Sequence, residues 1–463
     1  MSGYPKPFRH DAFAGLIGVA RVDITPPVGI YCRNWGAALH DRAEGIHRPL
    51  TLTALTLQIN QQEKPLVFVD ADASWWRNMT VERKFRQRLL QQLELDSAHL
   101  IFGLTHTHAA VPLTDEQDPS WEGGELLAPY LEKIYQATIE AVAQSLDTAQ
   151  PSTLDWHLGR CQLAAMRDLV DPEPASNRRL CGFDPSAEAD DTLLVGRVTN
   201  TQGKPVATLC NYACHPTTLA WDNKLISPDY IGAMRETVER ETNGAPALFM
   251  QAASGELGPR QGYVGDAKVA DQHGQQLGYS VLATLSDMEP PGQQLVFGGA
   301  VESGAVLAVW KHQEHVSNKT LSAHMFTVDL PLKNWPSADE LEQQLQTTED
   351  HALQERLRRK RNLRRGLGDS QTFALPVWIW KLGDALLVGT MAEAYSWIQQ
   401  HLRTIFPDRT IVYMNLINGS IGYLPPAGLY DEDVYPVWQT PFERGSLERL
   451  GQAIEEAITR TVI

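Results

Sequence analysis

IFGLTHTHAAV, residues 101–111, begins with the apolar residues typical of a buried strand and continues into two histidines separated by one residue. Side chains alternate between the two faces of a strand, so a strand running through this motif would place His106 and His108 on the same face. Two imidazoles on one face at the end of a buried strand indicate either a metal site or a polar cap on the strand.

Further short runs rich in Val, Ile, Leu and aromatic residues predict other strands, and helical patterns lie between some of them. The predicted strands are residues 16–24, 52–59, 66–69, 193–198, 205–210, 247–250, 386–388 and 411–416. Segments 82–96 and 129–146 carry apolar residues at the three- and four-residue spacing of amphipathic helices. Strands alternating with helices predict an α/β fold, with mixed β-sheets flanked by helices.

Composition limits the classes of partner. The 463 residues include 43% hydrophobic and 21% charged residues, and 40 Lys and Arg against 56 Asp and Glu give a formal net charge of −16. This balance argues against nucleic acid and against an anionic membrane surface as partners. The N-terminus has no apolar signal region, and no segment approaches the ~18 apolar residues of a membrane helix. We therefore expect a cytoplasmic protein with no integral membrane segment.

The five cysteines are scattered and form no CxxC pair, which argues against both a disulfide scaffold and a structural zinc ribbon. The segment 336–366 differs from the rest of the chain, because Ser337 and Glu340 form a capping box and the basic run RLRRKRNLRR follows. We expect one long charged helix or a helical hairpin there. Acidic residues precede the basic run, which favours a solvated helix face over a nucleic-acid patch.

Polar side chains gather where predicted strands end. His215 follows one strand, Glu393 follows another, and Tyr423 lies in the loop after a third. Open α/β sheets bind ligands outside the carboxyl ends of their strands, so these residues could meet His106 and His108 at one edge. Nitrogen and oxygen ligands of this kind suit Zn²⁺. In the alternative interpretation each histidine caps a strand, and Glu393 begins a helix whose dipole its charge complements.

Seven motifs occur in the order found in the neutral/alkaline non-lysosomal ceramidase family, which the chain resembles from about Gly18 to Ser446. They are GVARVDITPPVG (18–29), RAEGIHRPL (42–50), THTHAAV (105–111), NRRL (177–180), NYACHPTTLAW (211–221), QAASGELGPR (251–260) and NGSIGYLPP (418–426). The resemblance implies a ceramidase-like catalytic domain spanning residues 1–463, with a charged helical insertion at about 336–366.

The resemblance also implies site residues. Carried onto this chain, the family's catalytic zinc would be held by four residues: His106, His215, Glu393 and Tyr423. His108 resembles an active-site histidine that is not a primary ligand, and we expect it to relay a proton. Arg178 in NRRL matches a substrate-binding arginine, and Tyr435 matches a tyrosine that would hydrogen-bond the developing oxyanion.

Two departures from the family shape the expected chemistry. Gly258 stands where ceramidases carry the serine of a GDxSPN motif, with Ser254 as the nearest hydroxyl, and the printed chain ends at Ile463 without the family's C-terminal β-sandwich. We therefore expect direct hydrolysis by water that zinc activates, with no acyl-enzyme. The expected substrate is a soluble acylated small molecule rather than ceramide.

The resulting prediction is a zinc-dependent hydrolase that cleaves an N-acyl amide bond. A zinc esterase or lactonase and a non-catalytic zinc-binding relative remain open, and so does the oligomeric state. A TIM-barrel amidohydrolase also uses an HxH motif, but there it usually lies on the first barrel strand, whereas at least three predicted strands precede His106 here.

Overall fold

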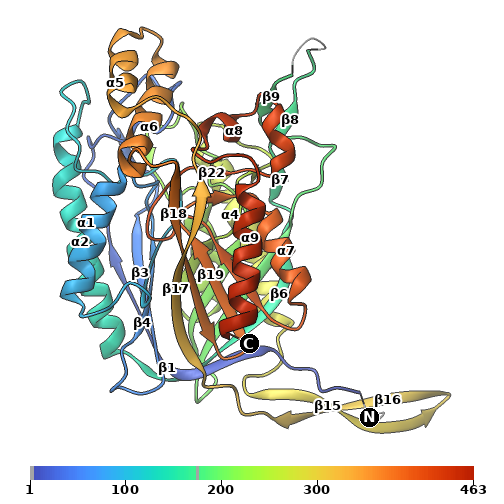
Figure 1. Cartoon of the computed structure of the whole chain (residues 1–463). Coiled ribbons are helices and arrows are strands. Elements are labelled where there is room, and N and C mark those ends of the chain that lie inside the picture. Colours follow the sequence, from blue (N-terminus) through green and yellow to red (C-terminus); the bar gives the residue numbers. More distant parts are fainter. Residues whose placement is uncertain (1–4, 174–176, 463) are drawn as a thin grey trace.

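The computed structural model of the protein describes residues 5–173 and 177–462. It confirms the α/β class with mixed sheets: two sheets lie at the centre, and helices cover their outer sides (Figure 1). The eight-stranded sheet has the order β13 (Ala247–Gln251), β11 (Pro205–Tyr212), β10 (Thr192–Asn200), β6 (Gln150–Arg160), β1 (Asp11–Asp23), β3 (Thr51–Gln58), β4 (Leu66–Ala71) and β5 (Leu100–Leu104).

The four-stranded sheet packs against one face of the larger one. Its order is β17 (Leu321–Pro331), β18 (Thr372–Leu382), β19 (Ala385–Thr390) and β21 (Ile411–Met414). Along β3, successive side chains point to opposite faces of the large sheet. Leu55 and Leu57 belong to the core shared by the two sheets, whereas Leu52 and Ala54 face the helices. Both faces of the large sheet are therefore apolar.

Helices cover the remaining faces. The helices are α1 (Met79–Gln92), α2 (Leu127–Asp147), α3 (Tyr230–Glu241), α4 (Ala267–Ser286), α5 (Ala338–Thr347), α6 (His351–Leu367), α7 (Trp397–Ile405), α8 (Tyr435–Gln439) and α9 (Ser446–Ala457). The first two pack on β3 to β5, the next two on β10 and β11, and α7 and α9 on the small sheet. Each sheet is thus covered on both sides.

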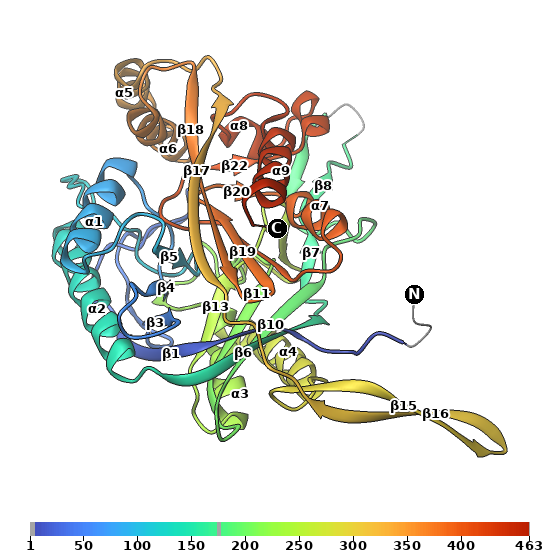
Figure 2. The ribbon, with the colours of Figure 1, turned by 60° about the horizontal axis from the view of Figure 1, so that its bottom comes forward.

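Short strand pairs complete the fold. They are β2 (Gly45–Ile46) with β12 (Leu225–Ile226), β7 (Ala164–Met166) with β14 (Leu257–Pro259), β8 (Asp168–Val170) with β9 (Arg179–Cys181), β15 (Gln293–Ser303) with β16 (Ala305–Glu314), and β20 (Glu393–Ala394) with β22 (Tyr423–Leu424). The β15–β16 hairpin projects away from the body of the molecule (Figure 2).

The charged segment forms the helical hairpin that the sequence allows. Ser337 caps α5 with the predicted capping box, and α6 follows after a short turn. Figure 1 shows both helices at the end of the molecule where α8 also lies. Residues of α6 line a cavity there, so this helix does not present only a solvated face.

Several strands end together near this cavity. The parallel pairs β4–β5, β11–β13 and β19–β21 each place two carboxyl ends at the same edge of a sheet. The backbone of Asn415 donates to the carbonyl of Gln251 at 2.9 Å, so the edges of the two sheets are joined. These open sheets, with their many antiparallel pairs, differ from the closed parallel sheet of a TIM barrel.

Among the helices of residues 5–173 and 177–462, none combines the length and the apolar character that crossing a bilayer requires. The cytoplasmic location expected from the sequence stays a prediction.

Candidate metal centre

His106 reaches the site through a turn and not through strand alternation. Strand β5 ends at Leu104, and His106 has a φ of +67°, a left-handed conformation that is uncommon for residues other than glycine. Its imidazole lies 4.7 Å from that of His108, centroid to centroid. The strand predicted from Ile101 to Leu104 is confirmed, and the two rings lie together as expected, but a turn and not strand alternation brings them together.

Both His106 and His215 are oriented by backbone carbonyls. The Nδ1 atom of His106 lies 2.8 Å from the carbonyl oxygen of Ser74, and Nδ1 of His215 lies 2.6 Å from that of Ser254. A carbonyl oxygen only accepts, so Nδ1 carries the proton in each ring and Nε2 presents its lone pair. This arrangement is typical of histidines that bind a metal ion through Nε2.

Glu393 and Tyr423 are held together by backbone pairing. They are direct partners in the parallel pair β20–β22, and the backbone of Glu393 donates to the carbonyl of Gly422 at 2.9 Å. Helix α7 begins only at Trp397, so Glu393 does not begin a helix as the alternative interpretation required. Two side chains 30 residues apart in the chain are thus fixed next to each other.

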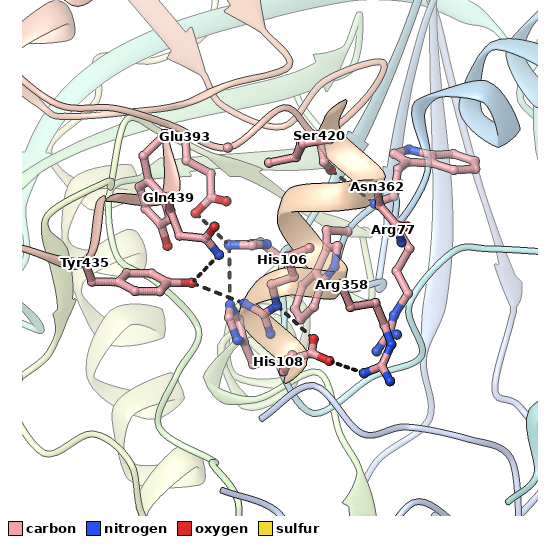
Figure 3. A pocket seen from close by; sticks show the side chains of 16 residues that line it. Arg77, His106, His108, Arg358, Asn362, Glu393, Ser420, Tyr435 and Gln439 are labelled. Atoms are coloured by element: carbon pink, nitrogen blue, oxygen red, sulfur yellow. Dashed lines mark hydrogen bonds and ion pairs between the residues drawn. The ribbon is translucent and has the colours of Figure 1, made fainter. Parts of the chain in front are cut away.

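The donor atoms of these residues converge, and Figure 3 shows Glu393 beside His106 and His108. Glu393 Oε2 lies 3.3 Å from His106 Nε2 and 3.1 Å from His215 Nε2. Tyr423 Oη lies 3.4 Å from His215 Nε2, and His108 Nε2 lies 3.4 Å from His106 Nε2. Ligand atoms around one tetrahedral ion with bonds of ~2.0–2.1 Å are themselves ~3.3–3.4 Å apart. The set therefore fits a single metal ion.

Electrostatics favour the protonation states that a metal ion needs. Burial and the nearby Arg167 lower the pKa of His215 to about 3, which keeps its imidazole neutral. Burial alone would raise the pKa of Glu393, but in the metal-free site its interactions with His106 and His215 hold this pKa well below its usual range. Tyr423 is the exception, because burial raises its pKa well above the usual value and keeps its phenol protonated.

His108 has different surroundings from the other two histidines. The rings of Trp35 and Trp75 lie 5.1 Å from its own, and burial together with His106 lowers the pKa of His108 well below its usual value. Its Nδ1 atom is buried without a hydrogen-bond partner among the described residues. Nε2 of His108 is close enough for a three-histidine site with His106 and His215. Its ring lacks the carbonyl support of the others.

Two adjoining cavities open over these residues. The inner cavity, of about 80 Å³, reaches His106 and Glu393, and the outer cavity has about 340 Å³. His108, Tyr423 and Tyr435 line both. The hydroxyl of Tyr435 accepts from Arg359 Nη1 at 3.2 Å, so its own proton remains available to a ligand.

Arg178 is not brought to these cavities. Its side chain is 58% exposed, and its guanidinium pairs with Asp171 at 2.6 Å. Two arginines that the sequence did not single out line the cavities instead. Arg167 donates to Tyr423 Oη at 3.1 Å, and Arg359 belongs to α6. Arg167 lies in no distinctive motif, whereas Arg359 belongs to the basic run that we expected to be solvated.

The remaining polar candidates have structural surroundings. Asp70 and Asp72 both pair with Arg235 at 2.7 Å. Asp229 caps α3. Ser254 is buried with its hydroxyl accepting from Gln251, and it lines neither cavity.

Gly258 leaves room for a side chain, since a Cβ there would meet nothing nearer than 3.7 Å, where Arg167 and Thr217 lie. The absence of the family serine therefore does not arise from lack of space.

Comparison with known proteins defines the class. Two solved structures share the fold. One, titled as a ceramidase complexed with C2, is 15% identical with a TM-score of 0.68, covering 96% of this chain and 76% of its own. The other, the neutral ceramidase from Pseudomonas aeruginosa, is 17% identical with a TM-score of 0.66, covering 95% and 73%. The fold is thus that of a neutral ceramidase.

The sequence identifies the family. Residues 16–273, more than half of the chain, match the family model described as neutral/alkaline non-lysosomal ceramidase, N-terminal. The chain belongs to the neutral/alkaline non-lysosomal ceramidase family. Family and fold support a hydrolase acting on amide bonds, and the histidine group supports a metal site without fixing the identity of the ion.

Proposed function

We propose that this protein is a zinc-dependent hydrolase that cleaves the N-acyl amide bond of a soluble small molecule. The observation that carries the proposal is the convergence of donor atoms from four distant segments beneath a cavity. His106, His215, Glu393 and Tyr423 would hold the ion. His108 is left outside this set because its Nδ1 atom lacks the carbonyl partner that orients His106 and His215.

When bound, the zinc ion would polarise the scissile carbonyl and lower the pKa of a water molecule. His108 then moves protons, because its neutral imidazole lies beside the ligands and lines both cavities. It takes a proton from the attacking water and delivers it to the departing nitrogen. Tyr435 donates its free hydroxyl proton to the carbonyl oxygen as negative charge develops there.

Arg167 and the aromatic walls position these groups. Arg167 donates one hydrogen bond to the carbonyl of Gly255 at 2.7 Å and another to Tyr423 at 3.1 Å, which fixes the phenol against His215. Trp35 and Trp75 each pack 5.1 Å from the ring of His108, between ring centroids, and limit how that ring can turn. Ser254 takes no part, because it lies outside both cavities. Substrate binding through Arg178 stays a prediction, since the side chain lies outside both cavities.

The test is a paired assay on zinc-loaded protein. N-acyl amides and the esters of matching structure are offered to the wild type and to His106→Ala. The proposal predicts amide hydrolysis in the wild type that falls to background in the variant. Turnover of esters alone would favour an esterase or lactonase, and no turnover above the variant's level with either series would favour a non-catalytic zinc-binding protein.

A further inference from the structure

We propose that helix α6 makes this site selective for anionic substrates, namely N-acyl amino acids whose carboxylate is bound by Arg359. This inference rests on the proposed hydrolase function and names its substrate class. In this arrangement the apolar acyl group occupies the outer cavity, and the amide carbonyl lies between Tyr435 and the metal ligands. The carboxylate points towards α6.

The charges that line the two cavities are unbalanced. Five arginines contribute to their walls, against two glutamates, one of which is the metal-facing Glu393; the arginines are Arg77, Arg167, Arg356, Arg358 and Arg359. This excess is local, because the whole chain carries a net charge of −16. A cavity with uncompensated positive charge is stabilised when an anion enters it.

Arg359 is the arginine best placed to meet that anion. It lines both cavities, as His108 does, so its guanidinium faces the space in which a substrate would bind. It donates to Glu355 at 2.9 Å, to Tyr435 at 3.2 Å and to the carbonyl of Asn34 at 2.7 Å. In the described part of the chain these partners take three of its five N–H donors. The guanidinium is thus anchored and retains donors for a carboxylate.

Arginines next to Arg359 add to the excess of positive charge in the cavities. Glu355 pairs with both Arg358 and Arg359, so one carboxylate compensates two guanidinium groups. The Nε atoms of Arg77 and Arg167 are buried without hydrogen-bond partners among the described residues. Figure 3 shows Arg77 and Arg358 on the side of the pocket where α6 passes. A carboxylate bound there would meet several donors, and a neutral group would satisfy fewer of them.

The outer cavity suits the apolar part of such a substrate. Aromatic side chains dominate its wall, with Trp35 against Tyr263 at 5.7 Å and Trp221 stacked on Tyr263 at 6.4 Å between ring centroids. Trp438 lies under the guanidinium of Arg356 at 3.9 Å on the side facing α6. An acyl chain fits between these rings. The carboxylate of the amino-acid part, on the other side of the amide bond, then meets the arginines.

The experiment compares two substrates that differ only in charge. N-octanoyl-alanine and N-octanoyl-alaninamide are assayed for kcat/KM with the wild type, Arg359→Gln and Arg365→Gln. Arg365 lies on the same helix but pairs with Glu342 away from the cavities, so it controls for the loss of one positive charge. Binding of both compounds to metal-free protein is measured by calorimetry, which gives a readout independent of turnover.

We expect the wild type to prefer the carboxylate on the order of 10- to 100-fold, as one or two charged hydrogen bonds would give. Arg359→Gln should abolish most of this preference. Because Arg359 also donates to Tyr435, kcat/KM should fall for both compounds, but it should fall further for the carboxylate. Arg359→Lys should restore part of it, and Arg365→Gln should retain all of it. The calorimetric affinity of metal-free protein for the carboxylate should follow the same order.

Three results would overturn the inference: equal or better use of the neutral amide by the wild type, an equal loss for both compounds in Arg359→Gln, or no recovery in Arg359→Lys. Hydrolysis of the neutral amide without charge preference would leave the proposed function intact. Conversely, carboxylate binding that depends on Arg359 with no turnover of either compound would contradict the proposed function and support the inference.

Discussion

His106 carries the most informative local conformation of the site. Its φ of +67° takes the chain out of β5 and turns the imidazole towards His215 and Glu393. A residue other than glycine in this region costs of order 1 kcal/mol, which the surrounding hydrogen bonds must offset. The backbone of His106 donates to the carbonyl of Ala73 at 3.1 Å, and its ring is held by Ser74. Such strain is retained where a side chain must point in one direction.

Mutation should distinguish the role of His108 in proton transfer from the role of the ligands in metal binding. We expect His108→Ala to keep its zinc and to lose about 10²- to 10⁴-fold in kcat, the range for removal of a general acid–base group. Zinc content and amide hydrolysis are measured on the same preparation. Zinc loss in His108→Ala equal to that in His106→Ala would show a three-histidine site and contradict the division of roles.

Tyr435 gives a second test at this level. Tyr435→Phe removes one hydroxyl from the cavity wall, and we expect kcat to fall about 10²-fold or more with the zinc content unchanged. Tyr430→Phe is the matched control, because the Tyr430 hydroxyl donates to the carbonyl of Phe442 instead of lining a cavity. A kcat for Tyr435→Phe equal to that of the control would assign Tyr435 to packing.

The site residues that the sequence predicted and those that it missed differ in how the fold brings them to the site. His106, His215, Glu393 and Tyr423 follow apolar strands, so strand ends indicated that they could meet, and the family resemblance assigned them as the ligand set. Arg359 reaches the site only because a whole helix folds over it, which no local pattern in the basic run records.

Helix α6 shows how an element can differ from its sequence pattern. The run RLRRKRNLRR favours a solvated face, but Arg361 is 6% exposed and pairs with Glu116, while Arg359 lines the cavities. The capping box of α5 and the helical hairpin were predictable from local signals. The face that α6 buries could not be predicted from local signals, because it depends on contacts with the distant segment around Asn34 and Trp75.

The position of α6 makes stability depend on pH through Glu355. Burial alone would raise the pKa of Glu355, but Arg359 and Arg77 outweigh it and lower this pKa to about 2. A carboxyl whose pKa is depressed on folding stabilises the protein above its unfolded pKa of about 4.5. That contribution is lost as the pH falls from about 4.5 towards 2.

We therefore expect Glu355→Gln to lower the Tm of metal-free protein at pH 7 and the difference from wild type to narrow below pH 4.5. The measurement is thermal unfolding of both proteins from pH 7 to pH 3. Glu349→Gln, in the exposed loop between α5 and α6, should match the wild type throughout. A Tm difference that stays constant with pH would contradict a role for the Glu355 charge.

For the molecule as a whole, the sequence predicted the fold class but not the complete set of strands. Alternating strands and helices indicated α/β, and most short apolar runs are strands. The long strands β6, β17 and β18 were missed, because polar and proline residues interrupt their pattern and the facing sheet supplies the burial. The β15–β16 hairpin was missed as well. Its two strands are mostly exposed, so no burial pattern marked them. That residues 1–463 form one domain stays a prediction.

Trp380 joins the two sheets and tests this arrangement. It is fully buried in the core between them, and its Nε1 atom donates to the carbonyl of Ala98, just before β5, at 2.7 Å. Trp380→Ala should lower the free energy of unfolding by about 3–5 kcal/mol. Trp310→Ala, on the projecting hairpin where the side chain is 41% exposed, should lower it by less than ~1 kcal/mol. Denaturant unfolding of both variants checks this, and similar losses would contradict a core between the sheets.

The account depends on one metal ion bound by side chains from distant parts of the chain. The most direct test is the metal content of protein purified without added zinc and then equilibrated with a slight excess of Zn²⁺. We predict about one zinc per chain in the wild type and almost none in His106→Ala or His215→Ala. A wild type that retains no zinc, or variants that retain as much as the wild type, would contradict the account.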